Sequence, residues 1–280
     1  MNKTLYLHEA RDLEVVRDGP SLWIKQRGLA GRRVPARLVD MVIIIGTVRI
    51  DTGVLTLFTD NNIPVTCMNK RGQETAVTMP YNHQLPVRYE EQQIFFTRDE
   101  GILRFEQWLL SERKRIQLNT VKRLSKNIAG LYLAQGFKEA DYRNFVRQYK
   151  PADEDKRLTI ETLIGNFFRE MLISGLMAAG LDPHMGVLHR RRNFGLALDL
   201  CHAMEGEVDI QTVRFLQRSP GEWMLKGKRG WEVSRDGMKD IIHRFENRKR
   251  ANLVMAEHLI DELFELMREL KYEGKLSRVL

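Results

Sequence analysis

The sequence has few cysteines and no long apolar run. Its 280 residues include two cysteines, Cys67 and Cys201, and neither belongs to a CxxC pair. This excludes a disulfide framework and favours a reducing compartment, so we expect a cytoplasmic protein. The longest apolar cluster, Met41–Ile45, is far shorter than the roughly 20 residues that a membrane helix needs. The first residues also lack the apolar core of a signal peptide, so no membrane association is expected.

Acidic residues are outnumbered by basic ones. The net charge is +8 and the isoelectric point is near 9.5, which favours a polyanionic partner, nucleic acid before a membrane. Basic side chains gather between residues 113 and 150 and again directly after His189. The residues that we expect to contact the phosphates of double-stranded DNA are Arg113, Lys114, Arg115, Lys122, Arg123, Arg190, Arg191 and Arg192.

The chain changes its hydrophobic period near residue 86. Before it lie short segments rich in β-branched residues and separated by turn signals such as Asp18–Gly19–Pro20. These segments predict an antiparallel β domain over residues 1–86. Within it, Val54–Phe58 fits either a strand or a helix, because its period is ambiguous.

The remainder, residues 87–280, predicts a larger all-α domain, so the fold class is α+β with two domains. Apolar residues recur there at three- and four-residue steps. The expected helices are 91–115, 121–134, 138–149, 159–179 and 248–271, with a hairpin at 223–233.

One stretch, from Gly180 to Asp209, carries the most information. Gly180 suits the left-handed conformation that ends a helix, and Pro183 prevents a restart. A short connection then brings His189, and the next predicted helix presents Asp199 and His202 three residues apart, on one face. Two imidazoles and a carboxylate beside a triple arginine indicate a metal site next to a polyanion.

This stretch resembles the signature of the CRISPR adaptation integrase family, the nucleases that insert spacer DNA into CRISPR arrays. The family pattern reads roughly GLDPxxGxLH, then LALDLxE and a closing VD. The matching residues here are Gly180–Pro183, Gly186, Leu188–His189, Leu196–Leu200 and Val208–Asp209. The resemblance implies a β domain that forms a homodimer, a helical domain with the active site, and a small ferredoxin-like partner of CRISPR adaptation.

The resemblance also implies a divalent cofactor, Mg²⁺ or Mn²⁺, held by a glutamate, a histidine and a second acid, which would activate the phosphodiester. His189 takes the place of the histidine and Asp199 lies beside the metal, so both are expected to be catalytic. The second acid is replaced by His202. Imidazole in place of a carboxylate disfavours Mg²⁺ and shifts preference toward Mn²⁺ or Zn²⁺.

The family's glutamate precedes a glycine, with a tyrosine two turns later. Its nearest match is Gln135–Gly136 followed by Tyr142, which puts an amide where a carboxylate is expected. Glu139, one turn on, is therefore taken as the third ligand beside His189 and His202, with Glu161 and Glu205 as weaker alternatives. Three hypotheses follow: an active integrase, a catalytically impaired DNA-binding scaffold of the same fold, or an unrelated metal-dependent hydrolase, which leaves the basic surface unexplained.

Overall fold

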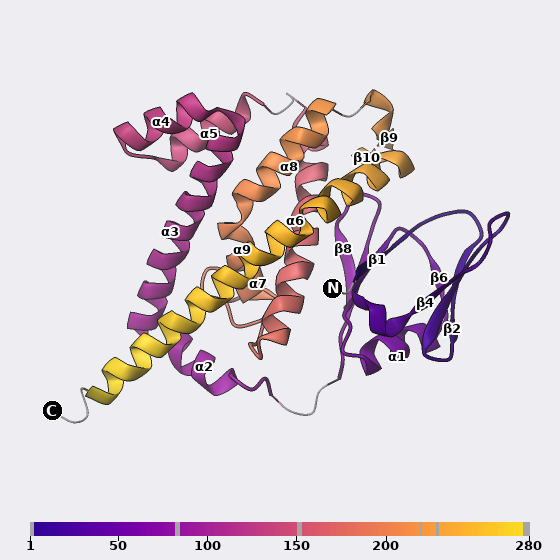
Figure 1. Cartoon of the computed structure of the whole chain (residues 1–280), viewed down its shortest axis with the longest axis horizontal. Helices are drawn as coiled ribbons and strands as arrows, with labels where there is room; N and C mark the ends of the chain where they lie inside the picture. Colours follow the sequence, from indigo (N-terminus) through magenta and orange to yellow (C-terminus); the bar gives the residue numbers. More distant parts are fainter. Residues whose placement is uncertain (1–2, 82–84, 150–152, 219, 228–229, 277–280) are drawn as a thin grey trace.

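The computed structural model describes residues 3–81, 85–149, 153–218, 220–227 and 230–276. Strands and one helix form the N-terminal part, and the following helices form a larger part beside it (Figure 1). This confirms the predicted α+β class, with strands first and helices after. The proposed boundary at residues 86 and 87 stays a prediction. Within the described residues, no helix combines the length and apolar character that crossing a bilayer would require.

The first sheet has the order β1-β5-β7-β8. Its strands are β1 (Lys3–His8), β5 (Val39–Ile45), β7 (Val65–Met68) and β8 (Glu74–Thr78). β5 is parallel to both β1 and β7, and only β8 runs antiparallel. The purely antiparallel arrangement expected from the sequence is therefore wrong for this sheet. The run of buried apolar residues in β5 has a physical reason, because a central parallel strand is covered on both faces.

The second sheet has the order β4-β3-β2-β6. It contains β2 (Leu13–Asp18), β3 (Ser21–Gln26), β4 (Arg32–Pro35) and β6 (Arg49–Ile50). β2, β3 and β4 are antiparallel neighbours, as predicted, whereas β6 pairs parallel with β2. A 3₁₀ turn, η1 (Ala36–Leu38), leads from this sheet into β5.

The ambiguous segment at Val54–Phe58 is helical and belongs to α1 (Thr52–Asp60). Asp51 caps it, since its side chain accepts a hydrogen bond from Gly53 N at 3.0 Å. Val54, Leu57 and Phe58 lie on one face and are buried with the apolar residues of both sheets. Tertiary burial of this face decides in favour of the helix.

The helical part is built around α6, which lies in its centre (Figure 1). Its helices are α2 (Tyr89–Thr97), α3 (Asp99–Leu124), α4 (Lys126–Gln135), α5 (Glu139–Arg147), α6 (Glu154–Ala178), α7 (Gly195–Ala203), α8 (Glu205–Arg218) and α9 (Arg235–Leu276). The single helix predicted over 91–115 is interrupted at Arg98 and continues to Leu124. The segment predicted over 248–271 is part of the long α9.

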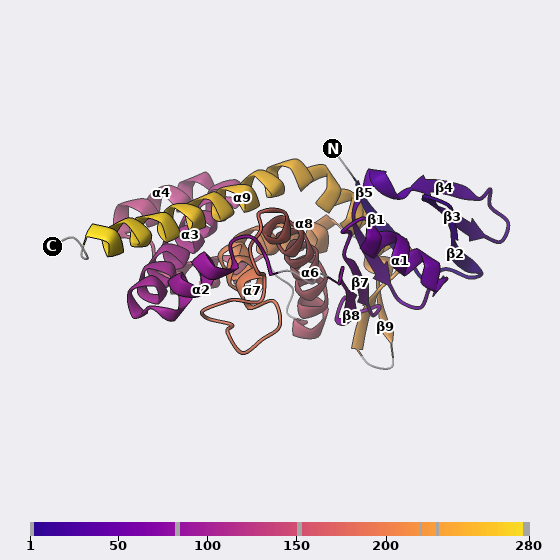
Figure 2. The same ribbon diagram turned by 90° about the horizontal axis from the view of Figure 1, so that it is seen from below.

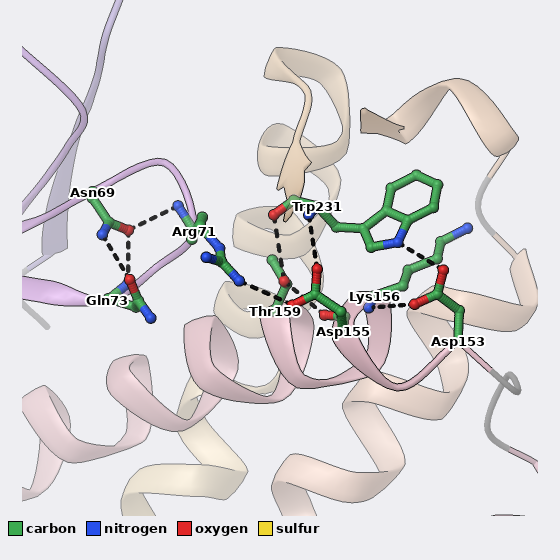
Figure 3. A network of polar contacts seen from close by, with 8 residues as sticks. All are labelled: Asn69, Arg71, Gln73, Asp153, Asp155, Lys156, Thr159 and Trp231. Atoms are coloured by element: carbon green, nitrogen blue, oxygen red, sulfur yellow. Dashed lines mark hydrogen bonds and ion pairs between the residues drawn. The ribbon is translucent and has the colours of Figure 1, made fainter. Parts of the chain in front are cut away.

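The predicted hairpin near Trp223 is present. After the turn η2 (Gly221–Trp223), β9 (Met224–Gly227) pairs antiparallel with β10 (Gly230–Val233). Figure 3 shows how Trp231 is attached to the start of α6: its indole Nε1 donates to Asp153 at 2.7 Å and its backbone N donates to Asp155 at 3.2 Å. Arg71, from the β7–β8 turn, reaches the same Asp155 at 2.9 Å. Three distant segments therefore meet at one helix N-terminus.

The first sheet joins the two parts of the molecule. Alternate side chains of β5 (Met41, Ile43 and Ile45) pack into the core of the helical part, whereas Val42 and Ile44 pack into the core of the N-terminal part. Because successive side chains of a strand point to opposite faces, β5 contributes to both cores. Through Met41, Ile43 and Ile45, β5 packs against α6.

Candidate active site

The loop after α6 begins with a helix stop of the predicted kind. Gly180 has φ +73°, and the backbone nitrogens of Gly180 and Leu181 donate to Met177 O and Leu176 O at 3.0 and 2.9 Å. This pair of bonds is the Schellman arrangement, which needs a left-handed residue. The chain then leaves the bundle as a loop that projects beside α7 (Figure 2).

Two glycines let this loop close on itself. A Cβ at Gly186 would lie 2.3 Å from the carbonyl carbon of Gly195, and a Cβ at Gly195 would lie 2.8 Å from His189 O. Such approaches are possible only without side chains. Phe194, which precedes α7, adopts φ +60° and stacks on His184 at 4.3 Å between ring centroids. The crossing holds the residues between the two glycines over the start of α7.

Asp199 anchors the loop from inside. Its carboxylate is fully buried and accepts hydrogen bonds from the backbone nitrogens of Val187, Leu188 and His189 at 2.6, 3.2 and 3.0 Å. It also lies 2.6 Å from His189 Nδ1. These three hydrogen bonds from backbone N–H groups stabilise the Asp199 carboxylate, whose burial would otherwise be costly.

The fourth bond orients the imidazole of His189. A carboxylate can only accept, so Nδ1 carries the proton and donates it to Asp199. The other ring nitrogen, Nε2, then presents a lone pair. The His189 side chain remains 30% exposed. A carboxylate behind a histidine fixes the tautomer and the ring orientation, so that the outer nitrogen can bind a metal or accept a proton.

His202 lies on α7, the helix that also carries Asp199, but the His202 ring faces the guanidinium of Arg113. Arg113 Nη1 lies 3.0 Å from His202 Nδ1 and 2.9 Å from the carbonyl oxygen of His202. Burial, reinforced by Arg113 and His189, lowers the pKa of His202 to about 4, so the ring is neutral at pH 7. Arginine has only donors, so Nδ1 of His202 accepts and its proton is on Nε2. Neither nitrogen of this ring offers a free lone pair.

Glu139 is held by the same arginine. Its Oε1 accepts from Arg113 Nη2 at 2.8 Å and from Arg143 Nη2 at 2.6 Å. The bond with Arg143, followed by Arg113, holds the pKa of Glu139 below its usual range. Glu205, at the start of α8, also pairs with Arg113. One buried guanidinium thus binds side chains from three helices.

These contacts test the expected metal set, Glu139, His189 and His202. His189 presents a suitable nitrogen, but the lone pair of His202 and the shared oxygen of Glu139 are already used by arginines. In the described part of the chain, no group of three or more His, Cys, Asp or Glu side chains is placed to hold a metal ion. The donor set as arranged does not fit Mg²⁺, which demands oxygen ligands in near-octahedral geometry.

The other candidates for the carboxylate lie elsewhere. Gln135, at the last position of α4, is exposed. Glu161 pairs with Arg157 on its own helix at 2.9 Å. Tyr142, the tyrosine of the family element, is buried and donates its hydroxyl to Asp209 at 2.6 Å.

The predicted DNA-contacting residues divide into two groups. Arg113 is 3% exposed and Arg123 forms an ion pair with buried Glu207, so both are engaged inside the protein. Contact of Arg113 and Arg123 with DNA phosphates stays a prediction, which these internal pairs do not favour. Exposed side chains remain at Lys114, Arg115, Lys122, Arg190, Arg191 and Arg192, of which Arg115 also pairs with Glu112 at 2.5 Å.

Sequence reasoning missed that Arg113 belongs to the site itself. The signal was present in the period of α3, since Phe105, Leu109, Ile116 and Arg113 share the buried face. The basic neighbours Lys114 and Arg115 obscured it. Glu205, considered only as a weak alternative, is the second site residue that deserved more weight.

Solved structures show which class of protein has this architecture. A Cas1 protein from Thermotoga maritima has a TM-score of 0.78 and 13% identity, with 95% of this chain and 97% of that chain covered. A casposase bound to integration product has a TM-score of 0.76 and 16% identity, covering 95% and 91%. A TtCas1–DNA complex has a TM-score of 0.66 and 14% identity, covering 95% and 92%. At these identities the likeness establishes the fold.

The sequence itself establishes the family. The model of the family described as CRISPR associated protein Cas1 matches residues 5–159, which is more than half of the chain. The protein belongs to the Cas1 family, as the Gly180–Asp209 stretch indicated. A search of curated proteins found no significant match.

Proposed function

We propose that this protein binds duplex DNA and joins its 3′ ends to a target strand, the integration step of spacer acquisition. The observation that carries the proposal is the His189–Asp199 pair, in which buried Asp199 holds the partly exposed His189 directly before the exposed Arg190–Arg192. Family membership and the likeness to a casposase bound to integration product support it. Exposed arginines are suited to bind phosphates, which gives strong, salt-dependent affinity for DNA.

The role that the geometry offers to His189 is that of a general base. Its Nε2 lone pair would accept the proton of an attacking 3′-hydroxyl while the new phosphorus–oxygen bond forms. The displaced 3′-oxygen of the target strand would leave as an alkoxide and take up a proton, either from the imidazolium or from water. Asp199 would stabilise the imidazolium through Nδ1. The number of phosphodiester bonds is unchanged in this exchange.

Strand transfer of a labelled duplex into supercoiled plasmid tests the proposal, with Mg²⁺, Mn²⁺ or a chelator in separate reactions. We expect joined product with the wild type and a loss of about 10²-fold or more with His189→Ala. His243→Ala is the matched control, because His243 is exposed on α9 and bonds only Asn247 among the interactions described. Equal product from wild type and His189→Ala would contradict the role of His189.

A second function is favoured by one observation, the engagement of Glu139 and His202 by Arg113. In this alternative the chain is a DNA-binding scaffold that lacks the chemistry. Wild-type protein that binds the duplex yet forms no product in any of the three reactions would select it. Failure to bind duplex DNA at low salt would exclude both functions.

We further propose that the protein acts in the cytoplasm as a homodimer, with a small ferredoxin-like partner. The support is the family resemblance, which implies dimer contacts in the strand-rich part. Light scattering of the purified chain should give twice its monomer mass of 32.8 kDa. A monomer at micromolar concentration would contradict the homodimer.

A further inference from the structure

A single buried cation is at the centre of the candidate site. The guanidinium of Arg113 contacts Glu139 on α5, His202 on α7 and Glu205 on α8. The Arg113 side chain is 4% exposed, and its fork provides donors in fixed directions. It therefore contacts two of the three side chains expected to bind a divalent ion, Glu139 and His202, and also Glu205.

The charges of the cluster are already balanced. The two carboxylates, Glu139 and Glu205, face two guanidinium groups, Arg113 from inside and Arg143 from the more exposed side. A divalent cation entering beside them would meet like charges and would have to compete for occupied oxygens. Arg113 is buried, whereas the side chains of Glu139 and Glu205 are 36% and 44% exposed, so removing a carboxylate leaves the buried guanidinium without one of its partners.

Helix packing keeps the guanidinium in place. Arg113 lies on the buried face of α3 with Leu109, Ile116 and Gln117. Along the same helix, Thr120 donates to Gly206 O of α8 at 2.8 Å. Packing of α3 against α7, which carries His202, and α8, which carries Glu205, therefore helps to fix the position of Arg113.

We propose that Arg113 is the resident cation of this site: it holds Glu139, His202 and Glu205 without a divalent ion, and its replacement by a neutral residue frees these three side chains to bind a transition metal. The proposal rests on the proposed function only for the location of the site. The expected ligand class is Mn²⁺, Co²⁺ or Zn²⁺, because an imidazole with carboxylates suits these ions better than Mg²⁺.

The test measures metal binding directly, without DNA. Mn²⁺ binding is followed by the electron paramagnetic resonance of the free ion, and Co²⁺ binding by its visible absorption. We expect no site in the wild type at micromolar metal, and in Arg113→Met one site per chain that binds about tenfold tighter or more than any site in the wild type. Arg115→Met is the matched control, since it removes an exposed guanidinium from the same helix and should gain no site.

Two further variants identify the ligands and guard against misfolding. Adding His202→Ala to Arg113→Met should remove the new site. Arg113→Lys retains a cation and should resemble the wild type. One tight Mn²⁺ site in the wild type that His202→Ala abolishes would overturn the proposal, and this measurement needs no Arg113 variant to fold. Folded Arg113→Met that binds no more metal than the wild type would also overturn it.

The outcome is separable from that of the proposed function. DNA binding and strand transfer are measured in other reactions, so loss of both would leave the metal titration unchanged. Product formed by the wild type in the presence of a chelator would support both proposals together. Metal bound tightly by the wild type would refute the resident cation and leave the integrase proposal standing.

Discussion

Asp199 organises more of the candidate site than its single side chain suggests. Its carboxylate closes the loop through three backbone amides and also sets which nitrogen of His189 faces outward. A buried carboxylate with this many donors is both a structural and a positioning group. Arg113 has a comparable role for the part of the site around His202, since its side chain contacts residues of three helices.

Glu170 is another buried carboxyl group, and it lies outside the site. It accepts a hydrogen bond from Thr66 of β7, and Arg169 Nη2 lies 3.3 Å away. Burial raises the pKa of Glu170. The folded state therefore binds this proton more tightly than the unfolded state, and the resulting stability is present below the unfolded pKa and is lost as pH rises through the folded pKa.

Glu170→Gln removes this titration and keeps the shape of the side chain. We expect the wild type to lose unfolding free energy relative to the variant between about pH 5 and about pH 8. Urea denaturation of both proteins at the two pH values measures it. The same change in both proteins would show that Glu170 does not titrate differently in the folded state.

Among the elements, the loop between α6 and α7 depends most on its backbone. Gly186 and Gly195 contact each other directly, and Phe194 accepts a left-handed conformation to start α7. The site is therefore built on a crossing that tolerates no side chain at either glycine.

Gly186→Ala should disrupt this crossing, because the new Cβ would meet backbone atoms of Gly195 and Leu196. We expect a loss of about 1–3 kcal/mol in unfolding free energy, measured by urea denaturation. Gly130→Ala is the control: a Cβ there meets nothing within 4 Å, and α4 should gain about 0.5–1 kcal/mol. Unchanged stability of Gly186→Ala would mean that the loop has another accessible path.

Across the whole molecule, charge is distributed unevenly between inside and outside. Arg113 and Arg123 form ion pairs with glutamates of the protein. The exposed cations near the site are therefore mainly Arg190–Arg192 and the basic residues on the exposed face of α3. DNA affinity should therefore depend on the loop more than on the full basic run of the sequence.

Reversing Arg190, Arg191 and Arg192 to glutamate should weaken duplex binding and flatten its salt dependence. Each lost phosphate contact changes the slope of log K against log salt by about 0.9. Fluorescence anisotropy at several salt concentrations measures this slope. The control reverses Arg11, Lys25 and Arg27, exposed residues of the strand-rich part, and changes the net charge equally. Equal loss in both variants would remove the loop from the interface.

Local patterns predicted a large share of this protein. The helical period of the second half, the hairpin at Trp223 and the helix stop at Gly180 depend on neighbouring residues, and each is confirmed. The motif from Gly180 to Asp209, which carries His189 and Asp199, likewise identified the family correctly.

Contacts between segments that are distant in the sequence could be identified only from the folded structure. The apolar run of β5 indicates a strand buried on both faces, but it does not name the parallel partners β1 and β7, because these lie tens of residues away. The role of Arg113 depends on α5, α7 and α8 arriving at one point. That convergence decides whether the Arg113 guanidinium faces water or carboxylates, since a buried charge requires a partner.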